Sequence, residues 1–162
     1  MCLFLGVFGC YGQWKQYSNK EYKFSILYPR SWEYNEDIYN TVFLAKEPIK
    51  SPTDKFQSNI NVVVTQLPQP LSLEAYYDLN KEELTRRLSP ITNILEGDVY
   101  SGMLAGKWFS FEGMMKDIVL RVTVAVWVKD KTVYTVTCSA PVKDYPKYEA
   151  TFFKIMRSLR AK

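Results

Sequence analysis

The sequence contains no histidine, and this absence removes most of the familiar catalytic arrangements. Histidine is the side chain that titrates near neutral pH and serves most often as a general base. Ser-His-Asp and Cys-His sites are therefore excluded within this chain. Three cysteines are present, Cys2, Cys10 and Cys138, with no Cys-x-x-Cys pair. The usual spacings of a zinc site are thus also missing, and we expect no metal site.

Glycine is sparse, with seven residues scattered along the chain. Neither G-x-G-x-x-G nor G-x-x-x-x-G-K occurs, so the sequence offers no phosphate-binding loop. Glu82 and Glu83 are adjacent on an expected helix, and consecutive helical positions do not share a face. The remaining acids match no calcium-binding loop. We expect no catalytic residues, no cofactor and no enzymatic activity.

The net charge is +4, which is too weak a basic field to indicate a nucleic-acid-binding protein. Residues 143–162 hold six bases and two acids, so this segment alone has a net charge of +4. Within it, Lys154, Arg157 and Arg160 lie on the expected outer face of a C-terminal helix. They are candidates for contact with an acidic partner; the alternative is a solvated helix face.

Residues 1–10, MCLFLGVFGC, are apolar but too few to span a bilayer, which takes about 20 residues. Their length suits the apolar part of a secretory signal. The segment VFGC (7–10) resembles a bacterial lipobox: Gly9 fits the pattern, whereas Phe8 departs from it. We therefore predict lipidation at Cys10, with residues 11–21 as a linker; the alternative is a buried or frayed terminal segment. The expected division is an N-terminal segment and linker, 1–16, and a folded domain, 17–162.

Residues 107–138 predict three successive antiparallel strands. Apolar side chains occupy every second position from Ile118 to Val128, so they share one face of a strand. Short polar breaks at 115–117 and 128–131 are suited to hairpins.

Further strands are expected at 22–28, 41–45, 59–66 and 91–104, and helices at 72–88 and 145–160. Ser72 is suited to capping the first helix, and a stripe containing Phe152 marks the second. These patterns predict the α+β fold class, with an antiparallel sheet and these two segments as its main helices; that the helices sandwich the sheet is implied by the family resemblance described below. Eight residues are predicted to be mostly buried: Phe24, Trp32, Val122, Val124, Val126, Val136, Phe152 and Leu159.

The order of these segments resembles the PsbP family and the wider Mog/PsbP-like fold. The similarity is carried by YKFSILYPRSW (22–32), SLEAY (72–76), LAGKW (104–108), KTVYTVTC (131–138), YPKY (145–148), Phe152 and Ser158-Leu159. Each motif is modest alone, but together they span about residues 17–160 in the family's order. An α/β/α sandwich is what this resemblance implies.

The resemblance also implies a non-enzymatic protein on the exported side of a membrane: the periplasm, the cell surface or the thylakoid lumen. In oxygenic phototrophs such proteins are extrinsic subunits of photosystem II that assist calcium retention; calcium is implied here by the resemblance only. Cyanobacterial members are lipoproteins, in agreement with Cys10. We expect a monomeric, membrane-tethered binding or assembly module whose partner is a membrane protein or the membrane surface. The alternative is a small-molecule or ion carrier that uses an aromatic groove between sheet and helix.

Overall fold

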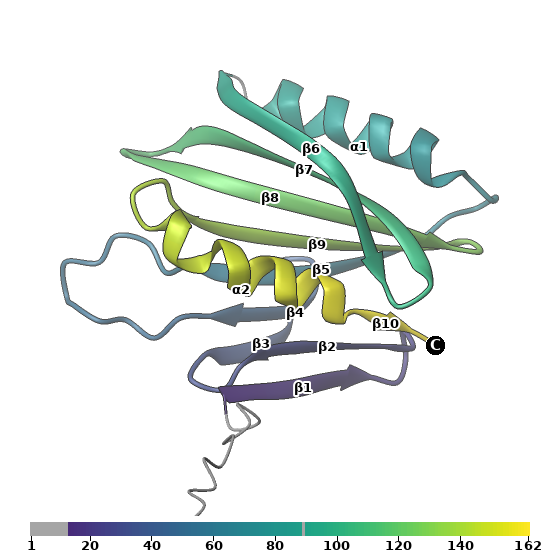
Figure 1. The fold of residues 1–162 in the computed structure, drawn as a ribbon, viewed down its shortest axis with the longest axis horizontal. Helices are drawn as coiled ribbons and strands as arrows, with labels where there is room; N and C mark the ends of the chain where they lie inside the picture. The colour runs from purple at the N-terminus through teal and green to yellow at the C-terminus, as the bar shows by residue number, and fades with distance from the viewer. Residues whose placement is uncertain (1–12, 89) are drawn as a thin grey trace, which may run out of the picture.

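The computed structural model describes residues 13–88 and 90–162, arranged as strands and two helices in one α+β unit (Figure 1). The elements are β1 Trp14–Asn19, β2 Phe24–Pro29, β3 Glu33–Ile38, β4 Thr41–Lys46, β5 Asn59–Gln66, α1 Leu73–Arg87, β6 Ile91–Ser101, β7 Leu104–Met115, β8 Ile118–Lys129, β9 Thr132–Pro141, α2 Tyr145–Ser158 and β10 Arg160–Ala161.

Within the described residues, seven strands form a sheet in the order β3-β4-β5-β9-β8-β7-β6, and its paired neighbours run antiparallel. Two-residue turns join β7 to β8 and β8 to β9. Lys116 and Asp130 open these turns with φ of 56°, the backbone conformation that tight hairpins favour. The prediction of three consecutive antiparallel strands is confirmed.

The large sheet is covered on both faces. On one face, Tyr77 of α1 packs in a core cluster with Phe109 and Val126. On the other face, α2 packs together with a small sheet of order β1-β2-β10, which lies at the lower end of Figure 1. Phe152 and Trp127 belong to this second, larger cluster. The predicted sandwich of sheet and helices is confirmed.

The core prediction is confirmed for seven of its eight residues. Phe24, Trp32, Val124, Val126, Val136, Phe152 and Leu159 are all buried. Val122 is half-buried at the edge of the α1-side cluster. The opposite face of β8, which looks mixed in sequence, carries the fully buried Trp127 and Ala125, and it contributes to the larger core.

The linker predicted at 11–21 is wrong for residues 14–19, which form β1. This strand pairs along its whole length with β2, from Trp14 opposite Pro29 to Asn19 opposite Phe24. Tyr17 is the one buried residue of β1, and its ring centroid lies 4.4 Å from that of Phe43. The backbone ladder, rather than an apolar pattern, makes this segment a strand. The folded domain therefore includes Trp14 and does not begin at residue 17.

Candidate functional site

The start of β1 is held firmly against β2. The backbone N–H of Arg30 donates to the carbonyl oxygen of Gln13 at 2.8 Å, immediately before the paired residues Trp14 and Pro29. The path of the chain at Gln13 is thus set by the domain. The predicted lipidation site, Cys10, and the rest of residues 1–12 lie outside the described residues.

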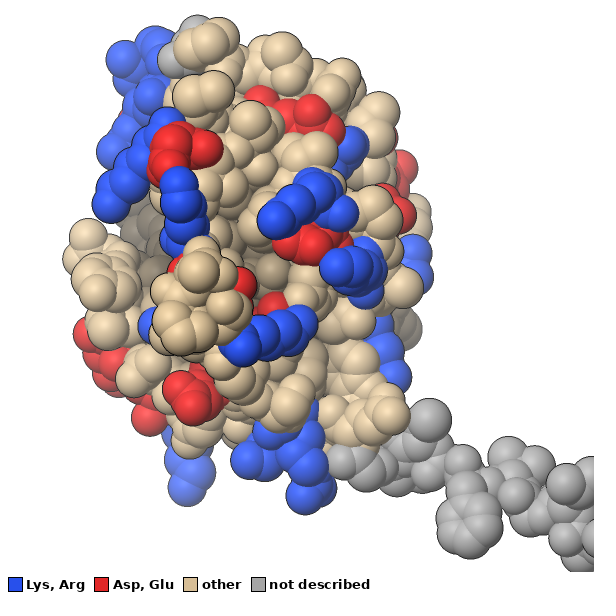
Figure 2. Space-filling model, turned by 90° about the vertical axis from the view of Figure 1, so that its left-hand side faces the viewer, with Lys and Arg blue, Asp and Glu red and all other residues tan. Residues whose placement is uncertain are grey.

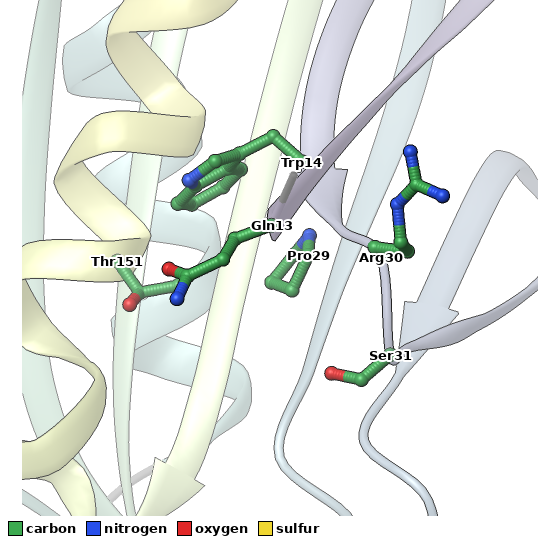
Figure 3. A pocket seen from close by; sticks show the side chains of 6 residues that line it. All are labelled: Gln13, Trp14, Pro29, Arg30, Ser31 and Thr151. Atoms are coloured by element: carbon green, nitrogen blue, oxygen red, sulfur yellow. The ribbon is translucent and has the colours of Figure 1, made fainter. Parts of the chain in front are cut away.

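A hollow of about 470 Å³ lies between this end of β1–β2 and α2. Figure 3 shows Trp14 and Gln13 reaching toward Thr151 on α2, while the side chain of Arg30 points away from the helix. Pro29 and Ser31 complete the lining. The hollow is open and its lining is mainly apolar, so it is suited to contacting a surface better than to enclosing a ligand.

Trp14 is flanked by positive charge. The ammonium of Lys154 lies 4.3 Å from the centroid of the Trp14 ring, within the range of a cation–π interaction. Lys15 and Arg30 are exposed at the same end of the β1–β2 pair, although Lys15, as the next residue of the strand, points to the opposite face of β1 from Trp14. Figure 2 shows Lys and Arg side chains along the lower end of the molecule, where β1 and β2 lie. This end of the domain thus combines an indole that carries a cation on its ring with further exposed bases that attract anions.

The three bases that were predicted to contact a partner lie in different environments. Lys154 stacks on Trp14, and the Arg157 guanidinium lies 5.5 Å from the Phe153 ring centroid. Arg160 is in β10 rather than α2, and its guanidinium donates to backbone carbonyls of Arg157 and Leu159 at 2.7 and 2.8 Å. Arg160 therefore closes the C-terminal end of α2, which leaves Lys154 and Arg157 as the outward charges of the trio.

A second cleft, of about 460 Å³, lies between α1 and the strands β6 and β7. It is lined by Glu74, Tyr77, Asp78, Lys81, Glu96, Gly97, Asp98 and Lys107. This is the place where an aromatic groove between sheet and helix was expected. One lining residue is aromatic, and six others are charged.

Both lysines of this second cleft are ion-paired, Lys81 with Glu96 and Lys107 with Asp98, while four acids against two bases leave the cleft net negative. The Tyr77 hydroxyl donates to Glu96 at 2.9 Å, and Lys81 forms an ion pair with the same carboxylate. Burial, reinforced by the Glu96 hydrogen bond, raises the pKa of Tyr77, whereas the hydrogen bond from Lys81 lowers the pKa of Glu96. Both groups are thus far from titrating at neutral pH. This network of hydrogen bonds and ion pairs favours a structural role over acid–base chemistry.

The second cleft was not recognisable from sequence because its residues come from α1, β6 and β7. Trp14 was missed for another reason: it was assigned to a linker. The sequence feature that could have indicated a site is Trp14 followed directly by Lys15, soon after the apolar residues 1–10.

Within residues 13–88 and 90–162, no group of three or more Cys, Asp or Glu side chains could hold a metal ion. Cys138 is fully buried, and burial raises the pKa of its thiol. In the described part of the chain, no helix is both long and apolar enough to cross a bilayer.

The architecture is that of the PsbP/Mog1 fold. Cyanobacterial PsbP (CyanoP) of Synechocystis superposes with a TM-score of 0.67 at 14% identity, over 98% of this chain and 99% of that protein. LpqN of Mycobacterium tuberculosis, a protein involved in cell envelope biogenesis, gives 0.68 at 9% identity, over 91% and 89% of the two chains. The Ran-binding protein Mog1p of Saccharomyces cerevisiae gives 0.61 at 10% identity, over 91% and 95%.

At these identities the likeness establishes the fold alone. No protein-family model and no curated protein sequence matches the chain.

Proposed function

We propose that this protein is a non-enzymatic, extracytoplasmic module that is tethered to a membrane through Cys10 and binds or assembles with a partner there. The observation that carries the proposal is the near-complete superposition on CyanoP, taken together with the lipobox-like residues 7–10. LpqN, with its part in cell envelope biogenesis, supports an envelope location. In an oxygenic phototroph, the corresponding role is that of an extrinsic protein associated with photosystem II.

The partner surface is proposed to include the outward charges Lys154 and Arg157 on α2. Both guanidinium and ammonium groups lie over aromatic rings, which hold them in place without neutralising them. Among the described residues, neither base forms an ion pair with an acidic side chain. An acidic protein surface at the membrane is the chemistry that matches them.

The carrier alternative has less support. The cleft between α1 and the sheet is charged rather than aromatic, and each of its two lysines is ion-paired with a carboxylate, Lys81 with Glu96 and Lys107 with Asp98. A ligand would have to displace these pairs. The proposal therefore favours a binding or assembly module.

Mass spectrometry of the native protein tests the tether directly. A lipidated Cys10 N-terminus is expected, and Cys10→Ala is expected to release the protein from membranes, because several acyl chains exceed the marginal hold of one. Cys138→Ala serves as the matched control, since Cys138 is buried in the core. An intact Met1 N-terminus, or unchanged membrane association of Cys10→Ala, would contradict the tether.

A further inference from the structure

We infer that the β1–β2 end of the domain is seated on the membrane surface, with Trp14 at the headgroup layer and Lys15 and Arg30 against anionic headgroups. This inference rests on the proposed tether at Cys10. It assigns an orientation and a lipid-contacting face that the tether alone does not specify.

The chain between the anchor and the folded domain is short. Gln13 is fixed by its hydrogen bond to Arg30, and Trp14 is already paired in the sheet. From Cys10 to Gln13 the chain spans at most about 11 Å even when fully extended. A free linker over residues 11–21 would have reached roughly 40 Å. Strand β1 removes most of this reach, so the domain cannot stand clear of the bilayer.

The headgroup layer that the domain meets is about as thick as this short connection is long. Headgroups add roughly 5–7 Å on each side of the hydrocarbon core. A thioether-linked anchor at Cys10 places that residue at this layer, so the β1–β2 end lies in or directly above it. The faces that carry α1 and β6 lie at the other end of the molecule (Figure 1) and are directed away from the lipid.

The β1–β2 end, which the short connection holds near the membrane, has side chains suited to an anionic lipid surface. Trp14 is half-buried and borders the hollow in Figure 3, and tryptophan is enriched at membrane–water interfaces. Lys15 and Arg30 are exposed at the same end of β1 and β2, and neither forms an ion pair with an acid among the described residues. Along the chain, the acid nearest to Lys15 is Glu21 and the acid nearest to Arg30 is Glu33. An anionic lipid surface matches this combination better than a neutral one.

A pair of fluorescent labels tests the orientation in the full, lipidated protein. Ser31→Cys places an environment-sensitive dye at the edge of the hollow, and Glu82→Cys places it on exposed α1 as the matched control. On vesicles of phosphatidylcholine and phosphatidylglycerol with nitroxide-labelled headgroups, the dye at position 31 should be quenched and the dye at 82 should not. Equal quenching at both positions, or none at 31, would overturn the inference while leaving a lipidated Cys10 intact.

The charge contribution is tested by Lys15→Gln together with Arg30→Gln. Each basic side chain near an anionic surface contributes roughly five-fold to binding, so the double variant should shift the balance from seated to lifted domain about 25-fold. The dye at position 31 then reports a loss of quenching that Lys116→Gln with Lys131→Gln, two exposed turn lysines, does not cause. If both double variants behave alike, the charged face is not a lipid contact. A chain without lipid on Cys10 would overturn the tether and this inference together.

Discussion

Replacing Gly106 by alanine should destabilise the fold strongly, because β7 passes directly over a buried indole at this point. A Cβ at Gly106 would overlap Nε1 of Trp127 and would lie 2.7 Å from the carbonyl oxygen of Val126. Trp127 is fully buried, and the Val126 oxygen belongs to the backbone of the neighbouring strand β8. Neither group can move aside without disturbing the larger core cluster or the sheet.

The expected loss is about 3 kcal/mol of the free energy of unfolding, the upper part of the range for overpacked cores. For a domain of this size such a loss lowers the melting temperature by about 6–12 °C. Urea denaturation followed by circular dichroism measures it: the midpoint should fall while the slope m stays unchanged.

Gly113→Ala provides a matched control in the same strand. Its added Cβ would meet Cγ2 of Ile91 at 3.6 Å and the Phe111 ring at 3.7 Å, which are ordinary contacts. A change between neutral and about 1 kcal/mol of stabilisation is expected, since alanine restricts the unfolded chain. Equal losses at the two positions, or no loss at Gly106, would refute the packing argument.

Three further predictions concern packing, pH and the end of α2. Phe152→Ala should cost about 3–5 kcal/mol, because the ring is fully buried in the larger core; urea denaturation measures this loss. Burial, with the hydrogen bond to Glu36, raises the pKa of Tyr17 to about 12. The folded state thus keeps this proton beyond the unfolded value of about 10, so stability is complete below pH 10 and declines from pH 10 to 12. Urea midpoints measured across that window should fall less steeply in Tyr17→Phe. Arg160→Ala should cost about 1–2 kcal/mol by freeing carbonyls at the end of α2, whereas Arg157→Ala should stay within about 0.5 kcal/mol; thermal unfolding distinguishes them.

Each of these predictions has a clear contrary result. A loss below about 1 kcal/mol for Phe152→Ala would mean that the core closes around the missing ring. An identical alkaline decline in Tyr17→Phe would assign the effect to other tyrosines. If Arg157→Ala proves as costly as Arg160→Ala, the guanidinium of Arg160 is not what holds the end of the helix.

The segments that were predicted well from the sequence are those whose apolar side chains repeat with the period of their strand or helix, or whose ends are marked by a local hydrogen bond. Ile118 to Val128 alternates strictly, and β8 lies in the interior of the sheet between β7 and β9. Ser72 was expected to cap α1, and its hydroxyl accepts the N–H of Ala75 at 3.2 Å. Local hydrogen bonding and periodicity are sufficient at these positions, because they act within a few residues.

The segments that were missed lack such a pattern. In β3, which runs from Glu33 to Ile38, every side chain but the last is exposed, because the strand forms an edge of the large sheet. In β1, Tyr17 alone is buried. These segments are strands because the backbone of β3 pairs with β4 and that of β1 pairs with β2. The sequence of a strand does not reveal which strand it will pair with.

The sequence by itself therefore determined the α+β class, the two helices and the central hairpins, through apolar periods of 2 and 3.6 that require burial on one side, and the order of its motifs indicated the sandwich by resemblance. Only the tertiary structure placed Lys154 on the ring of Trp14, moved Arg160 from the outer surface of a helix to its end, and incorporated residues 14–19 into the domain. These are contacts between segments far apart in the chain or pairings of backbone with backbone. Side-chain periodicity carries no information about either, and together they set how close the domain must lie to an anchor at Cys10.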